Sequence, residues 1–307
     1  MIKRSRCTVI VCCLLSVALF GARGNGCSSK SNTAVMQYKP DTPILRELAK
    51  KVLAKDWDAL DMAETAGNVA VPLLADLSEN SDPEVRLIAF HCLSLTDDEE
   101  ILGIMANALS DEEKEIRTLA IQYLNSKHNR SIIESLIYNL DNDDEIVRGG
   151  VAILLGNVAK IGEAKAMDPL YKRSEIETNK EVERDMALAL AKLGDSKMKD
   201  RFASQLDVPD SETRYRGIED LRYINDKALA KRLLPALDDL GEAYLLTGKG
   251  APEPKWGRVC DAAINLIGEL YDTPFSFEVS RYKIYSAEEI QEAKEFLKLL
   301  RIEHESE

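Results

Sequence analysis

The chain has 307 residues, 6% aromatic side chains and a formal net charge of −13. This length allows one or two globular domains or one long array of repeats. The composition argues against nucleic-acid binding, because phosphate neutralisation requires a basic face and the sequence shows no cluster of lysine and arginine.

The N-terminus has the pattern of a secretory signal over residues 1–26. Basic residues within positions 3–6 precede an apolar run over residues 7–20, and small residues follow. The apolar run has 14 residues, fewer than the ~20 that a membrane-spanning helix needs. We therefore expect an exported protein of the periplasm or cell envelope, without a transmembrane anchor.

Cys27 resembles the lipidated cysteine of bacterial lipoproteins, which becomes the new N-terminus. Gly26 matches the small residue that this family has before the cysteine, whereas Gly24 stands where leucine is usual and Arg23 separates the apolar run from the site. Cleavage after Gly24 or Gly26 without lipid is the alternative. In either case residues 27–41 read as a flexible polar tether, and contact with a membrane is expected only through the lipid or the signal.

A repeat array is expected over residues 42–268. Apolar residues at helical spacing predict a first helix from Pro43 and a second from about Trp57 to Ala66. A Val-Arg or Ile-Arg pair then recurs, with a small or branched residue three positions after the arginine and leucine seven positions after it. The arginines of this phrase, Arg86, Arg117 and Arg148, follow one another at intervals of 31 residues. A fixed period of this size is the signature of a stacked-repeat solenoid.

The later units keep the frame with changed residues at the arginine position. Glu183 takes this position in the next unit, Arg214 follows 31 residues later, and Cys260 occupies it in the last unit. The long last step is explained by an insertion over residues 241–257, which is loop-like at its centre. Residues 269–307 form a predicted cap and tail, irregular or briefly extended at first and helical from Ala287 to about Arg301. Solenoids need such an element to cover their last apolar face.

The phrase Val-Arg-x-x-Ala-x-x-x-Leu, with a proline in the first helix and an acidic turn between the helices, resembles the HEAT-like repeat family over residues 42–268. Val71–Leu74 with Arg86, and Val259–Ala263 with Gly268, carry the match best. The resemblance is closest to the short variant known from phycobilisome-lyase-type repeats. It implies an all-α fold, an α-solenoid in which about seven antiparallel helix pairs stack into a superhelix with a C-terminal capping helix. Such repeats mostly serve as binding scaffolds, and a chromophore- or small-molecule-handling lyase or isomerase is the alternative function.

Each arginine of the phrase stands at the start of a second helix, beside an acidic turn at Asp82, Asp111 or 141–144. A ladder of Arg–Asp pairs, one per unit, would tie neighbouring turns together, because the planar guanidinium binds a carboxylate through two hydrogen bonds. A charged binding stripe is the alternative interpretation. The expected ladder residues are Arg86, Arg117, Arg148 and Arg214.

A partner surface is expected on the second helices. Positions one and five after the arginine share a helix face that points away from the Ala/Leu core. We expect this face, the concave side of the solenoid, to hold a protein or peptide, with the insertion as a second contact because long loops on a rigid array often carry contacts. The candidate residues are His91, Gln122, Arg184, Tyr215, Glu219 and Asp261 on the helices, and Tyr244, Lys249 and Trp256 in the insertion. For each of them ordinary solvated surface is the alternative.

The sequence gives no support for catalysis. The three histidines are His91, His128 and His304. Some HEAT-like enzymes bind iron through repeated His-Glu pairs, and here only His304 precedes a glutamate. Cys92 and Cys260 stand in distant units, whereas a disulfide requires Cα atoms within about 7 Å, so both are expected to be small buried hydrophobic residues. We therefore expect a non-enzymatic, monomeric scaffold without cofactor or metal.

Overall fold

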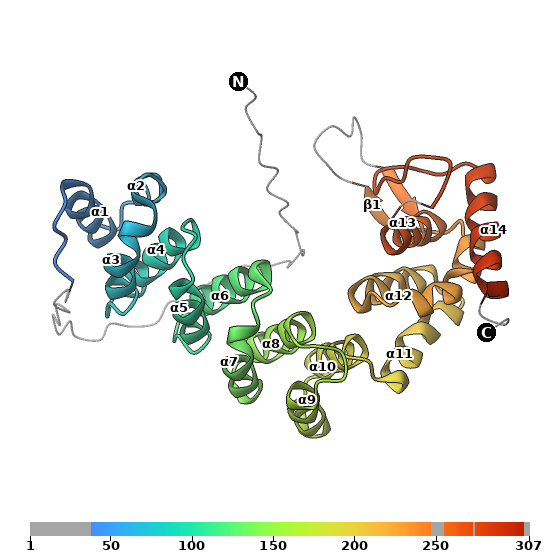
Figure 1. Ribbon diagram of the computed structural model, residues 1–307, viewed down its shortest axis with the longest axis horizontal. Helices are drawn as coiled ribbons and strands as arrows, with labels where there is room; N and C mark the ends of the chain where they lie inside the picture. Colours follow the sequence, from blue (N-terminus) through green and yellow to red (C-terminus); the bar gives the residue numbers. More distant parts are fainter. Residues whose placement is uncertain (1–37, 247–254, 273, 304–307) are drawn as a thin grey trace, which may run out of the picture. The chain divides into compact units, whose positions relative to one another are not determined.

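A computed structural model describes residues 38–246, 255–272 and 274–303. The predicted signal, Cys27, His304 and Lys249 lie outside these ranges. The described chain is an all-α solenoid of helix pairs, which confirms the predicted fold class (Figure 1). None of its helices is long and apolar enough to cross a membrane.

Each unit contributes a first and a second helix, joined by a tight turn. The first helices are α1 (Pro43–Leu53), α3 (Val71–Leu77), α5 (Glu100–Ala108), α7 (Ile133–Tyr138), α9 (Ala164–Ile176) and α11 (Ser196–Ala203). The second helices are α2 (Ala59–Ala66), α4 (Pro83–Ser94), α6 (Lys114–Lys127), α8 (Glu145–Val158), α10 (Lys180–Lys192), α12 (Ser211–Ile224) and α13 (Val259–Tyr271).

Short 3₁₀ helices fill several of the connections. They are η1 (Gly67–Ala70), η2 (Arg130–Ile132), η3 (Asn139–Asp141), η4 (Ser204–Asp207), η5 (Lys227–Leu233) and η6 (Pro235–Asp238). In the last unit η5 and η6 replace the first helix altogether, and α13 packs against both. The insertion holds an antiparallel pair of strands, β1 (Glu242–Leu246) and β2 (Lys255–Arg258), with a bulge between Glu242 and Tyr244.

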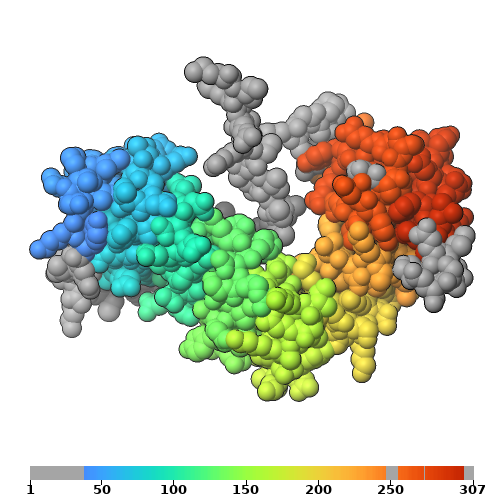
Figure 2. Space-filling view, in the orientation of Figure 1, coloured from blue at the N-terminus to red at the C-terminus, as the bar shows by residue number. Residues whose placement is uncertain are grey.

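The second helices form one continuous layer. Each contacts the next in the order α2, α4, α6, α8, α10, α12 and α13, and consecutive units adjoin in the same order along the surface in Figure 2. Several first helices also contact one another, including α1 with α3 and α7 with α9. Apolar side chains of both layers are buried between them, from Leu45 in α1 to Leu297 in the C-terminal helix. This two-layer packing buries faces that a single helix pair could not cover.

Short polar residues start the second helices. Asp82, Asp144 and Asn179 each accept a hydrogen bond from the backbone amide two residues further on, at 3.0, 2.8 and 2.9 Å. This satisfies an amide that the first turn of a helix leaves unpaired. Polar residues of the turns therefore cap α4, α8 and α10, whereas α6 begins after Glu113 without a side-chain cap.

Residues with positive φ end several second helices, and all but Gly67 are in the left-handed helical conformation. Gly67 after α2, His128 after α6, Asn225 after α12 and Asp272 after α13 have φ angles of 61, 47, 55 and 55°. A left-handed residue turns the chain away from the helix axis and is a common helix terminator. His128 therefore terminates α6 through its backbone conformation.

Close packing of α8 against α10 depends on glycine. A Cβ atom added at Gly156 would lie 3.1 Å from the Cα of Ala189 in α10, and such a distance is shorter than ordinary van der Waals contact. Gly156 therefore lets the two helices approach more closely than larger residues would.

The chain ends in a capping element. After α13, residues 274–286 run without regular structure, and α14 (Ala287–Glu303) packs against η5, η6 and α13. Ser286 and Glu289 cap α14 reciprocally: the Ser286 amide donates to the Glu289 carboxylate at 2.8 Å, and the Glu289 amide donates to the Ser286 hydroxyl at 3.3 Å. This capping box fixes the start of the last helix.

Candidate functional site

A ladder of arginines follows the N-terminal ends of the second helices. Arg86 donates from Nε and Nη2 to the two carboxylate oxygens of Asp111, at 3.0 and 2.9 Å. Its Nη1 donates to the carbonyl of Asn80 in its own turn at 2.9 Å. Arginines also pair across units in Arg117 with Asp144, Arg148 with Glu177, and Arg214 with Asp239. Arg148 binds both oxygens of its acceptor, whereas Arg117 and Arg214 each contact one oxygen, Oδ2. Because each acceptor belongs to the turn of the following unit, every rung joins two units.

The acceptor carboxylates are also held by backbone amides of their own turns. Asp111 also accepts the amide of Glu113 at 2.8 Å, and Glu177 accepts the amide of Asn179 at 3.0 Å. The Glu177 side chain is only 1% exposed, and the guanidinium of Arg148 lowers its pKa to about 2. Such charge-assisted, two-point pairs are the strong class of hydrogen bond. The arginines of the ladder are therefore engaged in ion pairs that hold neighbouring units together.

One rung has the reverse polarity. Glu183 holds the arginine position in α10, and its carboxylate accepts from Arg201 of α11 at 2.7 and 3.2 Å. The following unit here supplies the cation and the preceding unit supplies the anion. At the N-terminal end Lys55 makes the equivalent pair with Asp82 at 2.7 Å. The connection between units is thus kept where the sequence departs from the repeat.

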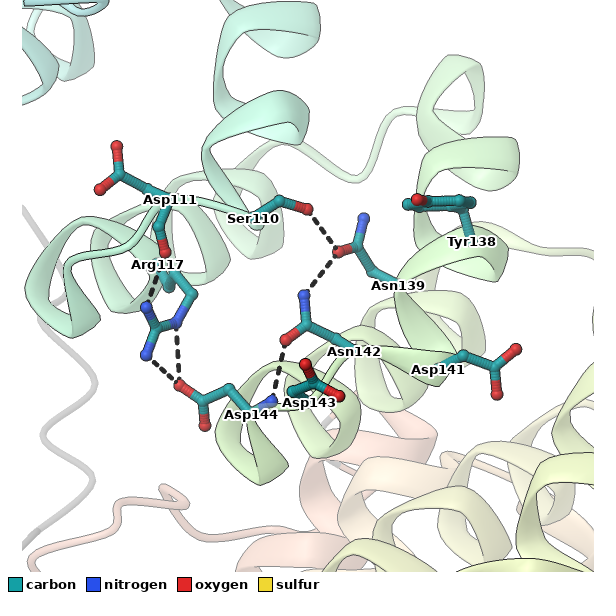
Figure 3. Close-up of a pocket in the computed structure, with 9 residues that line it drawn as sticks. All are labelled: Ser110, Asp111, Arg117, Tyr138, Asn139, Asp141, Asn142, Asp143 and Asp144. Carbon is teal, nitrogen blue, oxygen red and sulfur yellow. Dashed lines mark hydrogen bonds and ion pairs between the residues drawn. The ribbon is translucent and has the colours of Figure 1, made fainter.

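An open cavity of about 750 Å³ lies beside the ladder, at the turn between α7 and α8 (Figure 3). Its inner polar groups bond one another: the Ser110 hydroxyl donates to the amide oxygen of Asn139 at 3.3 Å, and the Asn142 side chain donates to the same oxygen at 3.1 Å. Tyr138 at the rim is 77% exposed, and the Asp141 side chain is 82% exposed. The cavity is a polar feature of the turn, with its buried groups already paired.

The predicted partner residues have different surroundings in the structure. Gln122 is exposed on α6. His91 is half-buried, with its ring 5.3 Å from that of Trp57 in an edge-on contact, and burial lowers its pKa. Tyr215 stacks on Tyr244 of β1 with ring centroids 4.7 Å apart. These residues lie in several units and do not converge on one pocket.

Two further predicted residues are engaged in ion pairs. Arg184 of α10 pairs with Asp220 of α12, and Glu219 pairs with Arg222 within α12. Both pairs are partly buried on the second-helix side. Arg184 therefore links two helices of the scaffold, a role that the sequence pattern did not indicate.

Asp261 was expected on the surface, and this expectation is wrong. Its side chain is 0% exposed, because residues 274–286 pack over the second-helix face of α13. One carboxylate oxygen accepts the amide of Tyr285 at 3.0 Å, and the other accepts the amide of Arg258 at 3.0 Å. Asn265, one turn further along α13, binds the Tyr285 hydroxyl at 2.7 Å. A segment of the chain itself thus occupies the face predicted to hold a partner.

The hairpin of the insertion presents two apolar side chains to solvent. Leu245 and Trp256 are paired across the strands and are 47% and 54% exposed. Tyr244, on the other side of β1, packs between Tyr215 and Gly257, where a Cβ atom would meet its ring. Trp256 was a predicted contact residue. Trp57, predicted to start the second helix, lies just before α2 instead and is 46% exposed beside His91.

Cysteine and metal chemistry find no support in the described residues. Cys92 and Cys260 are free and buried, and burial raises both thiol pKa values to about 12. A thiol of this kind is a poor nucleophile, because the thiolate is the reactive form. Across the ranges that the structure describes, no three His, Cys, Asp or Glu side chains gather as a metal site would require.

The stacked helix pairs and their ladder define an α-solenoid of repeated units. The family model for HEAT repeats matches residues 101–191, the part that carries α5 to α10. A search of the curated proteins gives no match.

Among solved structures, similar chains include one from the complex of CpcE and CpcF of phycocyanin lyase from a Nostoc species, with 15% identity, TM-score 0.46, and 88% of this chain and 99% of that chain covered. An archaeal HEAT-like repeats protein from Thermococcus onnurineus has 15% identity and TM-score 0.41, with 86% and 99% covered. An engineered protein has 17% identity and TM-score 0.38, with 76% and 69% covered.

Proposed function

We propose that the chain is a non-enzymatic scaffold of the cell envelope that binds a protein or peptide along its second helices. The observation that carries this proposal is the packing of residues 274–286 over α13. There the polar groups of Tyr285 are bound by side chains of the second helix α13 and of the adjoining strand β2. The amide is bound by Asp261, the hydroxyl by Asn265, and the carbonyl by Arg258 at 2.7 Å.

The bound segment illustrates how this layer can hold polypeptide. Carboxylate, amide and guanidinium groups on one helix and the adjoining strand satisfy both the backbone and the side chain of a peptide segment, with the Tyr285 ring buried to 2% exposure. A buried aromatic side chain with satisfied polar groups is the usual anchor of a protein interface. The layer formed by α4 and α6 lies several units from this cap, and Gln122 of α6 is exposed.

Location in the envelope rests on the secretory pattern of residues 1–26 and on Cys27. Mass spectrometry of the mature N-terminus tests this part. A diacylglyceryl group on Cys27 is the expected product for a lipoprotein, and cleavage after Gly24 or Gly26 is the product for export without lipid. An intact N-terminus at Met1 contradicts export.

Site-specific photocrosslinking tests the binding surface. A photoreactive phenylalanine replaces Gln122 on the second-helix layer or, as the control, Glu134 on α7, whose side chain is 69% exposed. We expect one protein adduct from position 122 that is absent from position 134. Equal labelling from both positions contradicts a specific face. A visible absorption band in the purified chain, from a bound chromophore, would instead favour the lyase alternative.

A further inference from the structure

Asp185 of α10 is a partly buried carboxylate without a donor from the protein. One of its oxygens lies where a side chain on Gly149 of α8 would begin, 2.6 Å from a Cβ atom built there. The interactions that affect its charge are burial and the fields of Arg184, Glu181 and Asp220, with no hydrogen bond among them. An ionised carboxylate can accept about four hydrogen bonds, so this group has unused capacity.

The cations nearby are committed to other partners. Arg184, the adjacent residue, pairs with Asp220 of α12, and Arg216 of α12 lies 3.5 Å from Glu181. These two ion pairs join α10 to α12. On the other side of α10, the surface that faces Asp185 is Gly149, which has no side chain to offer. The protein thus supplies cations between α10 and α12 but not between α8 and α10.

The Asp185 side chain is only partly buried, so its carboxylate keeps some contact with solvent. Among the described residues, the Tyr244 hydroxyl is the fully buried side-chain oxygen that lacks a hydrogen-bond partner. Gly149 is buried beneath this carboxylate, so a donor on another molecule would meet Asp185 from its remaining solvent-exposed side. A partly desolvated carboxylate without a partner is costly, so a donor brought by a ligand would gain more here than at an exposed aspartate.

We propose that Asp185 accepts hydrogen bonds from a lysine or arginine side chain of the bound protein or peptide, and so selects partners that carry a basic residue. This inference rests on the proposed function and names the chemistry of one contact. A cation is favoured over a neutral donor because charge-assisted hydrogen bonds are about twice as strong. The net charge of −13 adds a long-range attraction for basic segments.

Selection from a library of random dodecapeptides tests the inference. The wild-type chain, Asp185→Asn and the control Asp168→Asn are each used as the immobilised protein. Asp168 is exposed on α9, among the first helices, so its variant removes the same charge from the other layer. We expect wild type and Asp168→Asn to select peptides with a basic residue at a fixed position, and Asp185→Asn to lose that preference.

A cycle on the selected peptides makes the test quantitative. Replacing the fixed arginine by citrulline, or the fixed lysine by norleucine, should weaken binding to wild type at least tenfold and to Asp185→Asn less than twofold. Thermal unfolding verifies that the variant is folded. If Asp185→Asn keeps the basic preference, or if wild type selects peptides without one, the inference fails while the scaffold function stands. If no peptide is selected by any of the three chains, peptide binding fails together with the inference.

Discussion

The hydroxyl of Tyr223 in α12 donates a hydrogen bond of 2.8 Å to the carbonyl of Ile153 in α8, two units earlier in the array. Solenoid units ordinarily contact only their neighbours. This longer reach is possible because Gly156 of α8 has no side chain, and a Cβ atom there would collide with the Tyr223 hydroxyl. Lys192 of the intervening helix lies over the Tyr223 ring at 4.5 Å. The second helices of three units are therefore held together at one point.

Removing this bond should destabilise the chain. Tyr223→Phe deletes the hydroxyl and leaves the ring, so we expect a loss of about 1 kcal/mol in the free energy of unfolding, measured by urea denaturation. Tyr138→Phe is the control, because that side chain is 77% exposed. Equal stability of the two variants would show that the contact between α12 and α8 contributes nothing.

The ladder rungs should differ in strength according to their burial. In the Arg148–Glu177 rung the side chains are 11% and 1% exposed, whereas Lys55 and Asp82 are 38% and 39% exposed. Arg148→Ala leaves a buried carboxylate without its main partner and should cost about 3–5 kcal/mol. Lys55→Ala removes an exposed pair and should cost less than about 1 kcal/mol. Urea midpoints measure both, and similar losses would contradict the burial argument.

Stability should respond to pH through Asp185. Burial raises its pKa from 3.8 to about 6, so the folded state holds a proton that the unfolded state releases between these values. The contribution of this group to stability is full below pH 4 and is lost as the pH rises through 6, by about 3 kcal/mol at most. Asp185→Asn should remove that slope.

The measurement is the unfolding free energy of wild type and Asp185→Asn from pH 3 to pH 7. We expect the variant to become the more stable of the two as the pH rises towards 7. The difference between the curves isolates Asp185 from the other carboxyl groups. Parallel curves would mean that the Asp185 carboxyl keeps an ordinary pKa in the folded chain.

The two cysteines of the array should be unreactive in the native state. Burial raises the pKa of the Cys92 and Cys260 thiols to about 12 and shields both sulfur atoms. In a chain that begins at Ser28, a thiol reagent should label neither residue until the protein unfolds, and then label both. Rapid labelling in native buffer, compared with the same chain in urea, would show an opening that exposes α4 or α13.

The architecture could be predicted because each unit repeats the same local solution. A cap, a cation at the start of the second helix and small residues in the core recur at intervals of 31 residues from Arg86 to Arg148. Local patterns of this kind are visible in the sequence. For the same reason the sequence indicated that acidic residues of the turns accept the hydrogen bonds of the ladder. The prediction was of aspartates, whereas Arg148 binds a glutamate, Glu177.

The remaining details depend on contacts between distant parts of the chain. The burial of Asp261 is imposed by Tyr285, 24 residues later, and helical geometry within α13 cannot reveal it. The sequence did not indicate a partner for Glu183 at the arginine position. Its partner, Arg201, lies in α11, a first helix without the repeat phrase. Asp185 could not be identified from the sequence, because it differs from other aspartates only in having no hydrogen-bond donor opposite it. That absence results from the close approach of α8 and α10.

Because the pair of Glu183 and Arg201 has reversed charges, not every unit of this chain can be removed or exchanged for another. Excising the unit of α5 and α6 would bring Arg86 opposite Asp144, which is a compatible match. Excising the unit of α9 and α10 would bring Arg148 opposite Arg201 and leave two cations facing each other. The array can therefore gain or lose copies ahead of α9 without a mismatch, while the junction between α10 and α11 admits only one order of its parts.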